Sequence, residues 1–105
     1  MRVEFADKKL RDLFEYEGTV KGYSKALLKS YRSIVQFLMS ASSEQDIRAM
    51  LAFHYEKLEK DKKYDDDNFH SIRLKDQGST GKRLVLKRLD EDGLVLRIWS
   101  IEDYH

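Results

Sequence analysis

The feature of this sequence that most constrains its fold is a change in apolar spacing about halfway along the chain. Up to about residue 51 the apolar residues recur at helical spacing, whereas beyond residue 53 they alternate with polar residues as in strands. Helices followed by an antiparallel run of strands predict the α+β class, with helices on one face of a mostly antiparallel sheet. The opposite face would carry no helix, and a concave site could lie there.

The first half of the chain predicts one short strand and three helices. Residues 2–5 are a strand candidate, and Asp7 can cap a helix that Gly18 terminates. A second helix begins at about Ser24, and a polar, cap-like cluster opens a third, shorter helix over about residues 42–51. The second helix carries an apolar stripe that we assign to the core: Leu27, Leu28, Tyr31, Ile34, Val35 and Leu38.

The second half predicts strands separated by polar turns. The strands cover residues 53–58, 69–75, 82–89 and 94–101. Residues 59–67 form a highly charged loop, and residues 77–81 form a turn.

The last two strands are predicted to form a hairpin around residues 90–93, whose Asp-Glu-Asp-Gly composition favours a turn. We expect Leu89 to lie opposite Leu94. One face then carries Arg83, Val85, Lys87, Leu96 and Ile98. The other face carries Leu84, Leu86, Trp99 and Ile101.

The composition narrows the class of protein. A chain of 105 residues is long enough for one domain, over residues 1–105, and too short for two. The chain has no cysteine, so it can form neither a disulfide nor a thiolate metal site. No apolar run approaches a membrane span, and the N-terminus lacks the apolar segment of a signal peptide. We therefore expect a soluble, cytoplasmic protein.

The charge of the chain is small in sum but uneven along the sequence. A net charge of +1 argues mildly against a dedicated nucleic-acid binder. Acidic residues concentrate at positions 65–67, which we interpret as a solvated loop. A local basic surface can still form, because one segment with Asp76 as its single acidic residue contains Arg73, Lys75, Lys82, Arg83, Lys87 and Arg88.

The chain ends in an unusual set of polar groups. Glu102, Asp103, Tyr104 and His105 follow directly on the last predicted strand. A strand delivers such groups to one edge of a sheet, and histidine is the side chain whose ordinary pKa lies nearest neutrality. We therefore expect His105 to take part in acid–base chemistry.

Several pieces of the sequence together resemble a known family. They are a Ser-x-x-x-Asp helix start, a histidine segment, a Ser-Ile-Arg strand, an arginine in the next strand and a terminal Glu-Asp-Tyr-His. These pieces occupy residues 42–47, 54–57, 71–73, 83 and 102–105. Over essentially its whole length the chain resembles the HigB branch of the RelE/ParE toxin superfamily, and a RelE/ParE-like fold is implied.

The chain also departs from the pattern of that family. Tyr55 and Leu58 stand where proline and glycine are usual, and His70 stands where tryptophan often precedes Ser-Ile-Arg. The loop over residues 59–67 is longer and more acidic than the family pattern.

The resemblance implies the toxin of a type II toxin–antitoxin system. HigB members cleave translated mRNA in the ribosomal A site without a metal or other cofactor. The implied partners are the ribosome, mRNA and a HigA-like helix-turn-helix antitoxin, with operator DNA bound only through the antitoxin. The alternative is a ParE-like toxin that does no RNA chemistry and inhibits a protein such as DNA gyrase.

The resemblance also implies roles for individual residues. His54 and His105 would transfer protons, in an order that stays open, while Lys57 and Arg83 would stabilise the phosphate. Asp103 would orient a histidine or act as a base, and Tyr104 would position the substrate. We expect the RNA backbone to contact Arg73, Lys75, Lys82 and Lys87.

Each of these assignments has a structural alternative. His54 could be a surface residue on a strand, and Arg83 could bind a carboxylate. Arg73 could pair with Asp76 instead of RNA. Lys57 lies three residues after His54, so a regular strand would put the two on opposite faces, and the chain must bend between them for both to reach one site.

Overall fold

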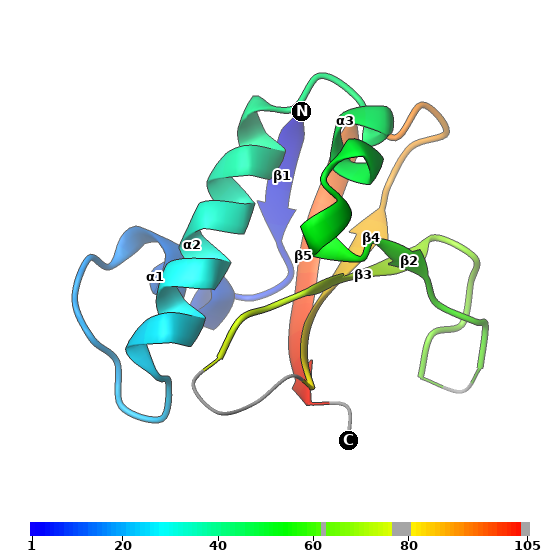
Figure 1. Ribbon diagram of the computed structural model, residues 1–105. Helices are drawn as coiled ribbons and strands as arrows, with labels where there is room; N and C mark the ends of the chain where they lie inside the picture. The colour runs from blue at the N-terminus through cyan, green and yellow to red at the C-terminus, as the bar shows by residue number, and fades with distance from the viewer. Residues whose placement is uncertain (62, 77–80, 104–105) are drawn as a thin grey trace.

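A five-stranded mixed sheet is the centre of the structure, a computed structural model that describes residues 1–61, 63–76 and 81–103. The strand order is β1-β5-β4-β3-β2 (Figure 1). β1 runs parallel to β5, and the other neighbouring pairs are antiparallel. The strands are β1 (Arg2–Phe5), β2 (Glu56–Lys57), β3 (Phe69–Arg73), β4 (Lys82–Arg88) and β5 (Val95–Asp103).

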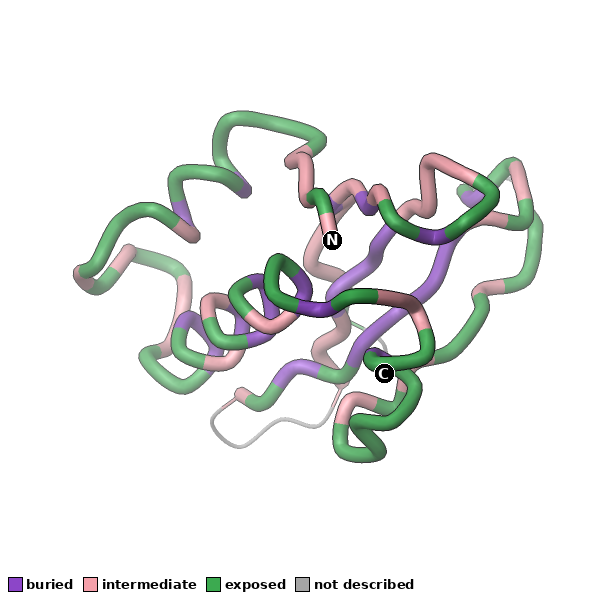
Figure 2. The backbone as a smooth tube through the Cα atoms, turned by 90° about the horizontal axis from the view of Figure 1, so that it is seen from above, coloured by how far each residue is buried: buried purple, intermediate pink, exposed green. Residues whose placement is uncertain are grey.

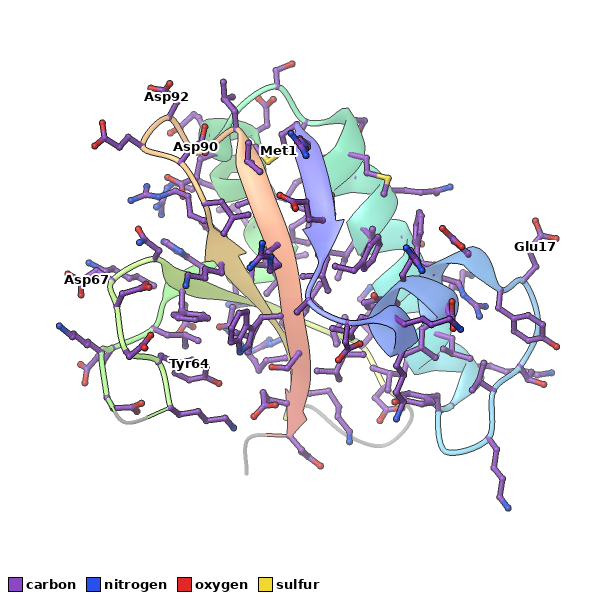
Figure 3. The ribbon with its side chains drawn as sticks, turned by 180° about the vertical axis from the view of Figure 1, so that it is seen from behind. Met1, Glu17, Tyr64, Asp67, Asp90 and Asp92 are labelled. Carbon is purple, nitrogen blue, oxygen red and sulfur yellow. The ribbon has the colours of Figure 1, made fainter. Side chains whose placement is uncertain are left out.

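The helices form a layer on one face of this sheet. They are α1 (Lys8–Glu15), α2 (Lys25–Ser40), α3 (Glu44–Ala49) and the 3₁₀ turn η1 (Leu51–Phe53). α2, α3 and η1 lie over one face with α1 beside α2, and the view from behind shows the other, helix-free face (Figures 1 and 3). The predicted α+β class is therefore confirmed. In the described part of the chain, no helix has the length and apolarity that a membrane crossing requires.

The starts of the first two helices follow the predicted caps. The Asp7 carboxylate accepts a hydrogen bond from the Leu10 N–H at 2.8 Å. The Ser24 hydroxyl accepts one from the Leu27 N–H at 3.0 Å. These bonds satisfy N–H groups that the first turn of a helix leaves unpaired.

The helix layer and the sheet share the main hydrophobic core. The predicted apolar stripe of α2 is buried along its whole length, and the buried positions of α2 and of the central strands are seen together in Figure 2. The second half of the chain contributes Ile72, Leu74, Leu84, Leu86, Leu96 and Ile98 to this core.

The predicted register of the hairpin is wrong by one residue. Leu86 pairs with Ile98, so both lie on the core face, where they are fully buried. The turn accommodates this register, because the Asp90 carboxylate accepts hydrogen bonds from the N–H groups of Leu94 at 2.9 Å and Val95 at 3.0 Å. A one-residue slip moves a whole strand's side chains to the other face, so burial selects the observed pairing.

A β-bulge in β5 changes the face of the residues that follow. The register shifts between Val85 and Leu86, so Leu84 pairs with Ile101 while Trp99 has no direct partner on β4. The prediction that Trp99 shares a face with Leu84 is therefore wrong, and Trp99 packs against the cluster of Tyr64, Phe69 and Val85 instead. A bulge adds one residue to one strand and reverses the alternation beyond it.

Residues 53–58 do not form the predicted strand. α3 ends at Ala49, η1 follows it, and β2 has only two residues. The Phe53 ring packs edge-on against Phe37 of α2, with centroids 5.3 Å apart and an interplanar angle of 89°. Burial of this ring against the helix layer outweighs the strand preference of the local sequence.

A second, smaller apolar cluster lies on the helix-free face. Tyr64, Phe69 and Val85 are its buried members, and Leu58 and Trp99 pack against them. Tyr64 comes from the charged segment 59–67, and its ring centroid lies 5.1 Å from that of Phe69 (Figure 3). This segment is therefore anchored against the face where we expected an open concave site.

Candidate functional site

Arg83 of β4 is held at the centre of the candidate site. It precedes the buried Leu84 and lies on the helix-free face. Its Nη2 donates to the His54 carbonyl at 3.0 Å and to the Ser71 hydroxyl at 2.9 Å, and its Nε donates to the same hydroxyl at 3.2 Å. A carboxylate oxygen of Glu56 lies 3.4 Å from Nη2. The side chain is 12% exposed, so the oriented guanidinium still reaches solvent.

His54 occupies a backbone conformation that is rare for a residue with a side chain. Its φ of 48° and ψ of 52° are left-handed, and within the described ranges it is the only non-glycine residue with a positive φ. This conformation costs about 1–3 kcal/mol and persists where neighbouring contacts impose it. The hydrogen bond from Arg83 is one such contact, so the structure brings together two predicted catalytic residues that are 29 positions apart.

β2 brings Glu56, and not Lys57, to the face that carries Arg83. Glu56 pairs with Ser71 and Lys57 pairs with His70, and directly paired residues lie on the same face of a sheet. The bend near Glu56 that would bring His54 and Lys57 to one site is absent, because the chain turns at His54 and the alternation of β2 stays intact. Lys57 therefore lies on the His70 side of β2.

The end of β5 approaches Arg83 through strand pairing. Glu102 pairs with Arg83 in the β4–β5 register, and Asp103 pairs with Lys82. The Lys82 ammonium lies 3.2 Å from an Asp103 carboxylate oxygen. Tyr104 and His105 lie outside the described residues.

Besides Lys82, the three other predicted RNA-binding residues separate into two groups. Arg73 pairs with Arg83 across β3 and β4, and Lys87 alternates onto the same helix-free face. Lys87 forms an ion pair with Asp66 at 3.2 Å, which offsets part of its charge. Lys75 lies beyond β3, where its N–H donates to the Ser30 hydroxyl at 3.0 Å, and so belongs to the α2 side.

Sequence reasoning did not find a cluster centred on Glu44, on the helix side of the sheet. The Glu44 carboxylate accepts a hydrogen bond from the Tyr55 hydroxyl at 2.9 Å and lies 4.0 Å from Nε2 of His70. It also pairs with Arg48 at 3.4 Å and with Arg88 at 3.7 Å. The sequence has no signal for this cluster, because its members come from α3, β3, β4 and the segment before β2.

The Glu44 cluster shifts the pKa values of its members. Burial acts to raise the pKa of Glu44, but the Tyr55 hydrogen bond and the charges of Arg48 and Arg88 outweigh it, and the net pKa is lowered. Burial also lowers the pKa of His70, against the opposing effects of the Asn68 carbonyl and Glu44. His70 is therefore buried in its neutral form, stacked on Tyr55 with centroids 4.8 Å apart at 6°.

A hollow of about 490 Å³ lies beside His54, and we call it the His54 hollow. It is lined by Arg48, Met50, Leu51, His54, Tyr55 and Glu56. A larger hollow of about 920 Å³ lies beside α1 and the segment that follows α1, and no predicted site residue lines it. We take the smaller one as part of the candidate site, because two residues that contact Arg83, His54 and Glu56, line it.

Comparison with models of known protein families, with curated proteins and with solved structures finds no match to this chain. In the described ranges, no cluster of three or more His, Asp or Glu side chains is arranged to hold a metal ion.

Proposed function

We propose that the protein is a ribosome-dependent mRNA endonuclease, the toxin of a type II toxin–antitoxin pair with a RelE/ParE-like fold of the HigB branch. The observation that carries this proposal is the hydrogen bond from Arg83 to the His54 carbonyl. It joins the residues to which the family resemblance assigns phosphate stabilisation and proton transfer. An arginine keeps its charge at any physiological pH, and a preoriented guanidinium needs little reorganisation when charge develops on a phosphate.

The proposed reaction is an attack by a ribose 2′-oxygen on the neighbouring phosphorus. A base removes the 2′-hydroxyl proton, the new oxygen–phosphorus bond forms, and the bond to the 5′-oxygen breaks as an acid protonates it. One product ends in a 2′,3′-cyclic phosphate and the other begins with a 5′-hydroxyl, so the reaction balances without a metal or cofactor. Arg83 stabilises the charge on the phosphate oxygens, and His54 and His105 transfer the protons, with their order open.

The strand register supports a contribution from the C-terminal residues. The Glu102–Arg83 and Asp103–Lys82 pairs bring the end of β5 to the strand that holds the guanidinium. Tyr104 and His105 follow directly in the sequence. In the proposed site Asp103 and Tyr104 orient a histidine and the substrate, and Lys57 contributes positive charge at the edge of the sheet.

The proposal extends to partners and location. A HigA-like helix-turn-helix antitoxin would bind the protein and would alone contact operator DNA. The toxin itself would act on translating ribosomes in the bacterial cytoplasm. These statements rest on the family resemblance.

The test is to map mRNA 5′ ends in a bacterial translation extract, with and without the purified protein. We expect cuts at ribosomal A-site positions that carry a 5′-hydroxyl. Arg83→Ala and His105→Ala should abolish the cuts, whereas Arg11→Ala, at an exposed position of α1, should not. Intact mRNA in the presence of folded wild-type protein would reject the nuclease and make inhibition of gyrase supercoiling the next assay.

A further inference from the structure

The lining of the His54 hollow combines apolar and charged side chains that the proposed reaction does not use. Met50 is 40% exposed and Leu51 is 83% exposed, although both are large apolar residues. Arg48 and Glu56 line the same hollow with opposite charges. A few polar groups around an apolar surface, in a hollow of about 490 Å³, are typical of small-molecule and nucleobase sites.

Two polar residues that line the His54 hollow, Tyr55 and Arg48, are held in place by contacts with Glu44 and His70, which lie outside the hollow. Tyr55 is fixed by its hydrogen bond to Glu44 and by its stack on the buried His70. The Arg48 guanidinium lies 5.1 Å from the centroid of the Tyr55 ring and pairs with Glu44, yet its side chain remains 46% exposed. A planar cation is therefore held in place with part of its surface open to a ligand.

We propose that the His54 hollow binds one nucleobase of single-stranded RNA, next to the phosphodiester held by Arg83. This inference rests on the proposed function and adds a base-recognition site to it. Unstacked bases of single-stranded RNA stack on arginine planes and aromatic rings, and Arg48 supplies such a plane. Met50 and Leu51 cover the apolar faces of the base.

Glu56 connects the base site with the phosphate site. It lines the His54 hollow, and its carboxylate lies 3.4 Å from Nη2 of Arg83. A carboxylate accepts hydrogen bonds from the amino group of cytosine, whereas uracil has no amino group to donate. The His54 hollow therefore prefers cytosine to uracil.

The experiment is an NMR titration of the full chain, labelled at amide, arginine side-chain and Met and Leu methyl positions. The probes are the 2′-O-methyl tetranucleotides UUCU and UUUU, which have no 2′-hydroxyl with which to be cleaved. We expect resonances of Arg48, Met50 and Leu51 to shift, and UUCU to bind about fivefold more tightly than UUUU. Met39, which is also 40% exposed, serves as the unmoved methyl control.

Substitutions test each part of the base site. Arg48→Lys keeps the charge but loses the plane, and should weaken binding of both probes about tenfold. Glu56→Gln should remove the preference for cytosine, because an amide can both donate and accept. Leu51→Ala should weaken binding, whereas Leu94→Ala, at a leucine that is 43% exposed in the hairpin, should not.

Two results would overturn the base site. They are equal binding of the two probes, and shifts at Arg73 and Arg83 without any at Met50 and Leu51, which would mean backbone binding alone. Failure of the nuclease proposal is read separately in the translation extract. Cytosine-selective binding without mRNA cleavage would reject the nuclease proposal and keep the base site. Cleavage without base-selective binding would reject the base site and keep the nuclease proposal.

Discussion

Replacing Ser71 with alanine tests whether one buried hydroxyl orients Arg83. The Ser71 hydroxyl accepts hydrogen bonds from Nη2 of Arg83 at 2.9 Å and from Nε at 3.2 Å. Ser71→Ala removes this acceptor from a charged side chain that is only 12% exposed. Hydrogen bonds to charged groups contribute about 1.5–3 kcal/mol. Because Arg83 keeps the His54 carbonyl and Glu56, we expect a free energy of unfolding lower by about 1.5 kcal/mol.

Urea unfolding followed by tryptophan fluorescence measures this change. Trp99 is the single tryptophan of the chain, and it packs on the helix-free face with its ring centroid 5.0 Å from that of Phe69. The slope of the free energy against urea concentration should stay constant, because the substitution changes little of the surface exposed on unfolding. The mRNA cleavage rate should fall in the same variant, since the guanidinium loses its fixed orientation.

The matched control is Ser100→Ala. Ser100 lies in the same row across the sheet, since Val85 pairs with both Ser71 and Ser100. Its hydroxyl oxygen is buried and has no hydrogen-bond partner in the described part of the chain. Removing a buried, unpaired hydroxyl should leave stability unchanged or raise it by about 1 kcal/mol. Equal losses in the two variants, or no loss in Ser71→Ala, would show that the Ser71 hydroxyl does not hold the Arg83 guanidinium.

Three further predictions concern Arg83, the Glu44 cluster and Tyr64. Arg83→Lys keeps one positive charge but not the forked donor, so cleavage in the translation extract should fall at least about tenfold while the protein stays folded; an unchanged rate would contradict the phosphate role. Acidification should destabilise the protein in two steps. Burial lowers the pKa of His70, so its contribution is complete above the unfolded value of 6.5 and is lost as the pH falls through the lower folded value. Burial acts to raise the pKa of Glu44, but its hydrogen bond with Tyr55 and the neighbouring arginines lower it overall. The contribution of Glu44 to stability is therefore complete above the unfolded value of 4.5 and is lost as the pH falls through the lower folded value. When urea unfolding is measured at a series of pH values, His70→Phe should remove the first step. If the step persists in this variant, it does not come from His70. Tyr64→Ala should lower the free energy of unfolding by about 3 kcal/mol, because it empties the cluster around Phe69, and a loss below about 1 kcal/mol would show that the 59–67 segment is not anchored there.

Some features of the candidate site could be expected from the sequence, and others could not. The motif positions indicated Arg83 and His54, which the structure joins through one hydrogen bond. The same motif predicted that Lys57 lies beside Arg83 and His54. The pairing of β2 with β3 instead brings Glu56 to the Arg83 guanidinium. The choice between adjacent residues of a strand depends on the register of its partner strand, which a local pattern does not contain.

Local sequence patterns were enough to predict the order of the elements, the capped helix starts at Asp7 and Ser24, and the buried stripe of α2. These features depend on residues within a few positions of one another, where capping and periodicity act. Tertiary structure alone decided the hairpin register, the left-handed turn at His54 and the cluster around Glu44. The reason is that alternation defines two faces of a strand without saying which is buried, and only packing against α2 and α3 makes that choice.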